Sequence, residues 1–188
     1  ERQVIPASVK SRQLANPFLA PSVAPARDAE PVRHRLDNWE LMSPLYKAFE
    51  QGAGGTAASM ELPPVPEYDR LSPKGLEIMD HQARFLESVR EGHRSFLLAD
   101  EPGLGKTAQS LIAASVAGAY PLLAVVPNVV KMNWSREVER WTPHRRATVI
   151  QGDGGQVDAF ADVFIVNYEI LDRHLAWLSS IGLKGMVV

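Results

Sequence analysis

The sequence predicts an α/β fold in which helices flank a parallel β-sheet. Short apolar runs, typical of strands buried on both faces, alternate with longer stretches whose apolar residues recur at helical spacing. A glycine-containing loop at residues 100–107 joins one of the apolar runs to a helical stretch. Strands that alternate with helices indicate parallel pairing, with helices on both faces of the sheet.

The candidate strands are apolar runs at residues 96–99, 122–126, 148–150, 163–166 and 186–188. The helical spacing predicts a helix through Leu76, Met79, Ala83, Leu86 and Val89, and others over 108–116 and 170–178. A further helical stripe consists of Val130, Trp134, Val138 and Trp141. We interpret its two tryptophans as core residues, because they share the stripe with apolar neighbours. In parallel sheets ligands bind beyond the carboxyl ends of the strands, and the loop at 100–107 follows such an end in this prediction.

Composition divides the chain near residue 73, into an arm over residues 1–73 and a lobe over 74–188. Ten of the 14 prolines lie before the boundary, and proline interrupts both helices and strands. A short helix over residues 39–50 is the main exception, and residues 62–66 are expected to form an extended linker. No motif in this arm carries chemistry, so we expect it to bind a protein partner or to cover the lobe.

The loop at 100–107 has the residues that a phosphate-binding loop needs. Glycines let backbone N–H groups turn around phosphates, and the following helix presents the positive end of its dipole. Lys106 would reach the β- and γ-phosphates, and the Thr107 hydroxyl would ligate Mg²⁺. Asp100 stands where the usual pattern G-x-x-x-x-G-K-[ST] has glycine. The alternative is an ordinary turn between a strand and a helix.

Composition excludes several other classes. The chain has 188 residues, no cysteine and a formal net charge of −2, so disulfide frameworks and cysteine zinc sites are excluded and no overall basic character points to nucleic acid. No apolar stretch approaches the roughly 18–20 residues of a membrane span. The histidines have no metal-ligand spacing. The segment 151–155 is rich in glycine, and we interpret it as a turn.

Four segments together resemble the Swi/Snf-related ATPases, a branch of the superfamily 2 helicases. The first is Leu98–Thr107, with Pro102 where the family usually has Met. The others are Met79–Leu86, then 125–128 followed by Trp134, Glu137 and 141–143, and finally 166–171. They stand in family order over about residues 76–188. The resemblance implies a RecA-like P-loop NTPase fold, ATP and Mg²⁺ as cofactors, and nucleotide contacts from Gln82, Asp100, Gly103, Leu104, Gly105, Lys106 and Thr107. Within that set Gln82 would contact adenine, whereas Lys106 and Thr107 would act in catalysis.

The resemblance also implies a nucleic-acid track, with DNA favoured over RNA. Pro127, Asn128, Asn167 and Tyr168 match family positions near that track. Such contacts go largely to phosphates, so a net charge of −2 counts little against them. Basic residues around the third helix are interpreted as a solvated face: Lys131, Arg136, Arg140, Arg145 and Arg146.

In the family, a strand such as residues 185–188 runs into the sequence Asp-Glu-x-His, and a second RecA-like lobe follows. The chain is therefore expected to be the front part of a first motor lobe, from an ATP hydrolase that translocates on DNA, and to be inactive alone because the arginine finger is missing. The alternatives are a non-catalytic interaction module and another P-loop enzyme, such as a small-molecule kinase. We expect an intracellular protein, and the lack of a basic targeting cluster favours a cytoplasmic bacterial or viral protein over a nuclear one.

Overall fold

The computed structural model describes residues 2–15, 62–65 and 72–188. The helix expected over residues 39–50 and the end of the linker at Pro66 lie outside these residues. The division of the chain near residue 73 therefore stays a prediction.

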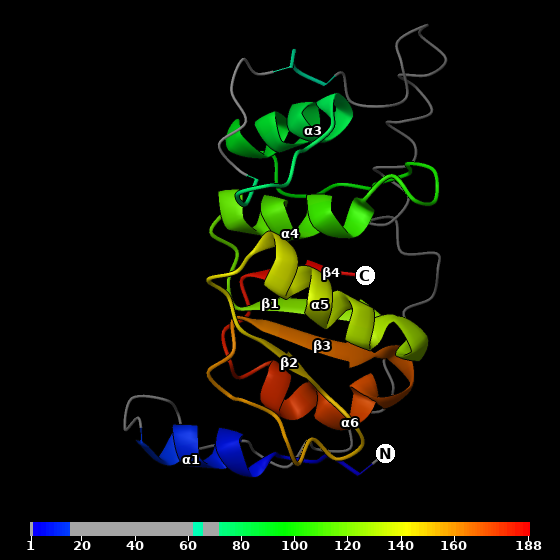
Figure 1. The fold of residues 1–188 in the computed structure, drawn as a ribbon. Coiled ribbons are helices and arrows are strands. Elements are labelled where there is room, and N and C mark those ends of the chain that lie inside the picture. The colour runs from blue at the N-terminus through cyan, green and yellow to red at the C-terminus, as the bar shows by residue number, and fades with distance from the viewer. Residues whose placement is uncertain (1, 16–61, 66–71) are drawn as a thin grey trace, which may run out of the picture.

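A parallel sheet forms the centre of the described lobe (Figure 1). Its four strands are β1 (Leu122–Val126), β2 (Ala147–Val149), β3 (Val163–Asn167) and β4 (Gly185–Val187), in the spatial order β2-β3-β1-β4. Every pair is parallel, with Val126 opposite Asn167 and Val149 opposite Ile165. Four of the expected strands, and the parallel sheet flanked by helices, are therefore confirmed.

Alternate residues of β1 and β3 separate the core into two apolar layers. Leu123, Val125, Phe164 and Val166 face α6 (Tyr168–Leu178), where Trp177 is fully buried. The other set faces α4 (Lys106–Val116) and α5 (Lys131–Trp141), and it consists of Leu122, Ala124, Val126, Val163 and Ile165. Trp134 and Trp141 pack against this second layer, so their interpretation as core residues is confirmed. Burial on both faces explains why β1 is apolar throughout and why β3 is apolar up to its last residue, Asn167.

Helix α3 (Asp80–Arg90) lies on the outer side of α4, where Phe85, Leu86 and Val89 pack with Ile112. The linker reaches this helix as well. The Arg84 guanidinium donates hydrogen bonds to the carbonyl oxygens of Pro63 at 2.7 Å and Leu62 at 2.9 Å. Residues before the expected boundary thus contact the lobe beyond it.

The strand expected at residues 96–99 is wrong. This run forms no ladder with any described strand, and Leu97 is 93% exposed. Two of its hydrophobic side chains contact α3 instead. The Phe96 ring meets the Phe85 ring edge-on, at 4.8 Å between centroids, and Leu98 packs against the cluster of Phe85, Leu86, Val89 and Ile112. An apolar run predicts burial, but only hydrogen bonds to a neighbouring strand make it part of a sheet.

An N-terminal strap, defined here as residues 2–15, lies along α6 and the loop that follows β2 (Figure 1). It contains helix α1 (Ala7–Ala15), which the proline-rich composition did not predict. The Val4 N–H donates to the Arg173 carbonyl at 2.9 Å, and Ser8 and Arg12 donate to the carbonyls of Val157 and Ala159. Val9 is 4% exposed within the α6 layer. The strap therefore covers the lobe, as one of the two roles expected for the arm requires.

Candidate nucleotide and nucleic-acid site

The loop before α4 has the backbone shape of a phosphate cradle. Gly103 and Gly105 have φ values of +92° and +71°, which side chains other than glycine rarely adopt. Helix α4 begins directly afterwards at Lys106. The N–H groups of its first turn have no acceptor within the helix, so they are available to an anion. In Figure 1 the loop lies on the side of the molecule toward which the strands point.

The Lys106 amine lies inside this loop. It donates to the Asp100 carbonyl at 2.7 Å and to the Glu101 carbonyl at 2.9 Å. These bonds hold the positive charge on the concave side of the cradle, where phosphate oxygens would replace the carbonyls as acceptors. Thr107 is half-buried in the first turn of α4, next to that amine in sequence.

Two glutamines hold the loop from the protein side. Gln82 is 3% exposed, and its side-chain nitrogen donates to the Leu104 carbonyl at 3.0 Å. A Cβ atom on Gly105 would lie 2.6 Å from the same nitrogen, so a larger residue there would displace the end of the Gln82 side chain. Gln109 donates to the Asp100 carboxylate at 2.9 Å, an interaction that the sequence reasoning missed. The sequence did offer a signal for Gln109, because it lies one turn after Lys106 and therefore on the same side of α4.

The residues of the loop and of the start of α4 fit the phosphates of a nucleoside triphosphate. The donor set consists of one ammonium group and unpaired helix N–H groups, which is the chemistry that phosphate oxygens need. The side-chain nitrogen Nε2 of His81, beside Gln82, is buried and has no hydrogen-bond partner. The structure thus brings Gln82, Asp100, Gly103, Leu104, Gly105, Lys106 and Thr107 together, although no paired strand precedes the loop.

The carboxyl ends of β1 and β3 carry the residues expected near nucleic acid. Since Val126 is opposite Asn167, Pro127 and Tyr168 follow at the same edge of the sheet. Pro127 and Asn128 are exposed at the start of the 3₁₀ turn η1 (Asn128–Val130), and Tyr168 is 48% exposed at the start of α6. Asn167 differs from these residues, because it is only 5% exposed.

Lys131 does not belong to a solvated face, contrary to the sequence interpretation. It is 6% exposed at the start of α5, and its amine donates to the Ile150 carbonyl at 3.0 Å and to Asn167 Oδ1 at 2.7 Å. The Asn167 side-chain nitrogen in turn donates to the Glu169 carboxylate. The error arose because sequence charge alone does not reveal acceptors on other strands. The other expected members of that face are exposed or half-buried: Arg136, Arg140, Arg145 and Arg146.

Burial and charge shift the pKa values of Lys131 and Glu169. Burial lowers the pKa of Lys131, and the nearby Glu169 carboxylate partly opposes that effect. The hydrogen bond from the Asn167 side chain is the main reason that the pKa of Glu169 is lowered, with its backbone N–H and Lys131 adding to it. Both directions follow from the environment, because burial disfavours a charge and donors favour a carboxylate.

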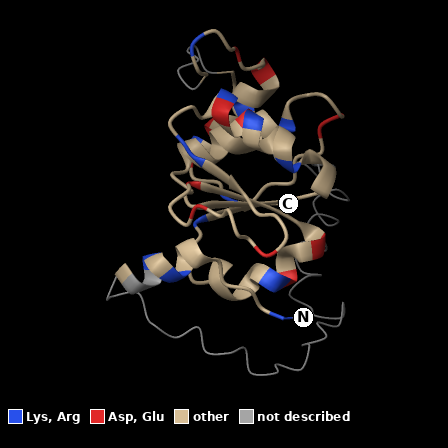
Figure 2. Ribbon diagram, turned by 60° about the horizontal axis from the view of Figure 1, so that its bottom comes forward, with Lys and Arg blue, Asp and Glu red and all other residues tan. Residues whose placement is uncertain are grey.

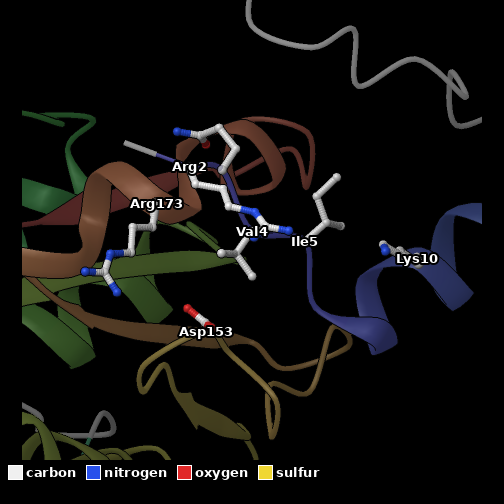
Figure 3. A pocket seen from close by; sticks show the side chains of 7 residues that line it. Arg2, Val4, Ile5, Lys10, Asp153 and Arg173 are labelled. Atoms are coloured by element: carbon white, nitrogen blue, oxygen red, sulfur yellow. The ribbon is translucent and has the colours of Figure 1, made fainter.

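A cavity of about 630 Å³ lies elsewhere, between the strap, the turn after β2 and α6 (Figure 3). Arg2, Lys10, Asp153 and Arg173 line it, together with Gln3, Val4 and Ile5. None of the residues expected to bind nucleotide or nucleic acid lines this cavity. The strap forms one wall of this cavity (Figure 3).

Charged side chains of both signs are distributed over helices and loops, whereas the strands carry none (Figure 2). Among the described residues no cluster of three or more His, Asp or Glu side chains could hold a metal ion. Within the same part of the chain, no helix has the length and apolar character to cross a bilayer. The segment 151–155 forms turns, as expected.

A parallel sheet, together with a glycine loop that leads into α4 at a lysine, defines an α/β protein of the P-loop NTPase class. The family is more specific. Residues 79–188 match the model of the SNF2-related domain, so the chain belongs to that family. The resemblance to Swi/Snf-related ATPases is thereby confirmed, over more than half of the chain.

Similar proteins agree with this family. Over 120 residues the chain is 31% identical to the yeast (Saccharomyces cerevisiae) ISWI chromatin-remodeling complex ATPase ISW1, covering 55% of this chain and 10% of that protein. It is 30% identical to the SWI/SNF-related matrix-associated actin-dependent regulator of chromatin subfamily A-like protein 1 of Xenopus tropicalis, over 71% of this chain and 14% of that protein. The chain thus spans a small part of these relatives.

Among solved structures, the chain is similar to the Sulfolobus solfataricus SWI2/SNF2 ATPase core in complex with dsDNA. It shows 27% sequence identity and a TM-score of 0.46, over 61% of this chain and 25% of that chain.

The expectation of a cytoplasmic bacterial or viral protein over a nuclear one is wrong. The curated relatives described above are eukaryotic proteins whose names place them in chromatin remodelling, and another is named a nuclear protein. The absence of a basic cluster is weak evidence about location, because it reports on one short kind of targeting sequence and says nothing about the family.

Proposed function

We propose that the chain is the nucleotide-binding part of an ATP-dependent DNA translocase of the Swi/Snf type. The observation that carries this proposal is the contact between Gln82 and the Leu104–Gly105 segment of the loop, at 3.0 Å from the Leu104 carbonyl. It brings a candidate adenine-binding side chain and a phosphate cradle into one site, as a whole nucleotide requires. Family membership supports the same function.

The residues have distinct roles in this proposal. The Lys106 amine leaves the carbonyls of Asp100 and Glu101 and binds the β- and γ-phosphates, where it stabilises charge in the transition state. The Thr107 hydroxyl would ligate Mg²⁺, which supplies charge neutralisation between the phosphates, and Asp100 is part of the loop that would bind the nucleotide. The N–H groups of Gly103, Leu104 and Gly105 complete the cradle.

The nucleic-acid part of the proposal concerns the carboxyl edge of β1 and β3. Pro127, Asn128 and Tyr168 are exposed there. Asn128 and Tyr168 offer backbone N–H groups and polar side chains to a phosphate backbone, whereas Pro127 has no N–H group to offer. Contacts of this kind carry no sequence information, which suits a motor that moves along DNA. The second RecA-like lobe, a DNA partner and a protein partner for residues 1–73 belong to this proposal.

The decisive experiment measures ATPase activity of the full-length protein with and without double-stranded DNA. We expect DNA to stimulate hydrolysis, and Lys106→Ala to lower the rate by roughly 10²–10³-fold, because a preorganised donor to the transition state is lost. Lys184→Ala is the matched control, since this exposed lysine precedes β4 and lies outside the nucleotide loop. Equal activity of the Lys106→Ala variant and the wild type would contradict the proposal.

A further inference from the structure

Lys131 is an unusual buried charge. Lysine is almost never fully buried unless it is paired, because burial disfavours its ammonium group. Here the amine has two oxygen acceptors, the Ile150 carbonyl at 3.0 Å and Asn167 Oδ1 at 2.7 Å. Solubility does not explain a buried ammonium group at this position, because an apolar side chain would fill the same space.

Asn167 is the second part of this arrangement. Its amide oxygen accepts from Lys131, and its amide nitrogen donates to Glu169. With 5% of the residue exposed, this side chain is directed toward protein groups. The Asn167 side chain therefore links Lys131 to Glu169 within the protein.

The hydrogen bonds join chain segments that are distant in sequence. Ile150 follows β2, Asn167 ends β3, Glu169 lies in the first turn of α6, and Lys131 begins α5 directly after η1. Lys131 and Asn167 are 36 residues apart in the chain. The bonds therefore fix the position of η1 relative to the start of α6.

We propose that Lys131 is a positioning residue for nucleic acid: its amine holds the exposed turn 127–130 and the exposed Tyr168 together as one surface for a phosphate backbone. The role rests on the proposed function, because it assigns a purpose to that surface. Lys131 itself does not touch the nucleic acid. It acts through Asn167 and the Ile150 carbonyl, which set the spacing of the two contact segments.

The test compares three variants of the full-length protein for the concentration of double-stranded DNA that gives half-maximal ATPase stimulation. Lys131→Met keeps the length of the side chain and removes its charge, and we expect this concentration to rise at least about tenfold, because small misplacements of binding groups lower activity strongly. Lys131→Arg retains donors for both acceptors and should restore most of the affinity. In both variants KM for ATP and the rate without DNA should stay at wild-type values, since the nucleotide loop is untouched.

Arg136→Met is the matched control, because this exposed residue lies on the same helix and loses the same charge. If Arg136→Met weakens DNA stimulation as much as Lys131→Met does, the effect is one of net charge and the positioning role is overturned. Wild-type DNA response in Lys131→Met overturns the positioning role alone, and the proposed function stands. A wild-type protein that DNA does not stimulate overturns both.

A second variant applies if Lys131→Met does not fold. Asn167→Ala removes the acceptor and leaves the lysine paired with Ile150, and we expect the same weakening of the DNA response. Hydrogen exchange supplies a readout independent of activity: backbone amides of residues 128–130 and 168–170 should exchange faster than in wild type, while those of α4 should not. Unchanged exchange in both turns would overturn the role.

Discussion

Gly105 shows how a single residue joins two parts of the candidate site. Its φ of +71° constrains the backbone, whereas the 2.6 Å between the Gln82 nitrogen and the place that a Cβ atom would take constrains the space. Gly103 has a φ of +92°, but a Cβ atom added there would meet nothing within 4 Å. Glycine is therefore favoured at position 103 by the backbone conformation alone, and at position 105 by both the backbone conformation and the space available.

We expect Gly105→Ala to lower the free energy of unfolding by about 1–3 kcal/mol, through backbone strain and displacement of Gln82. Gly103→Ala should show the strain alone and so destabilise less. Urea denaturation of both variants measures the difference. Equal losses would mean that the Gln82 contact adds nothing to the requirement for glycine.

Tyr120 provides a test of stability against pH. The residue is 8% exposed, and its hydroxyl lies 2.8 Å from the Ser115 hydroxyl. Burial raises the pKa of Tyr120, although Ser115 and Arg145 oppose the shift. The unfolded chain therefore loses this proton at a lower pH than the folded chain does. Its contribution to stability is complete below about pH 10 and declines as the pH rises through the folded pKa.

Tyr120→Phe should reduce this alkaline decline and lower stability near neutral pH by about 0.5–1.5 kcal/mol, because the hydrogen bond to Ser115 is lost. Thermal unfolding of both proteins between pH 8 and 11 measures the difference, and other alkaline titrations, including that of Lys131, are common to the two. A constant difference across that range would contradict the predicted shift.

At the scale of elements, the sequence allowed the strands 122–126, 148–150, 163–166 and 186–188 to be predicted within about one residue. For 122–126 and 163–166 the reason is burial on both faces, which leaves a continuous apolar run. The other two strands are only partly buried, and their short apolar runs were enough to predict them. The run 96–99 was misleading, because Phe96 and Leu98 contact the α3 cluster while Leu97 stays exposed. An apolar run therefore establishes neither that a segment is buried nor that it pairs with a strand. The nucleotide loop was predictable because all its parts except Gln82 are local in sequence.

The strap was not predictable, because its contacts lie about 150 residues away. Val9→Ala tests whether it folds with the lobe. Removing two buried carbon atoms from the α6 layer should lower the free energy of unfolding by roughly 1.5 kcal/mol. Lys10→Ala, at an exposed neighbour, should change it by less than about 0.5 kcal/mol. Denaturant unfolding of both variants checks this, and an unaffected Val9→Ala protein would show that the strap is not part of the cooperative unit.

At the scale of the whole molecule, the alternation of strands and helices along the sequence predicted the fold class but not the order of the strands. A net charge of −2 and alternating apolar runs are compatible with any order of strands, whereas the observed order β2-β3-β1-β4 depends on which helix crosses which face. That order places β1 and β3 side by side and so creates the edge that carries Pro127 and Tyr168. Lys131 was misassigned for a related reason: its partners Ile150 and Asn167 lie just after β2 and at the end of β3, and only the complete sheet brings them near.

The strap also has a consequence for synthesis on the ribosome. Ser8 and Arg12 leave the ribosome well before their acceptors Val157 and Ala159, which follow 149 and 147 residues later. At translation speeds of about 5–20 residues per second, the delay is roughly 7–30 s. During that interval Ile5 and Val9 have no α6 layer to pack against, so these two side chains stay exposed on the nascent chain until their partner emerges.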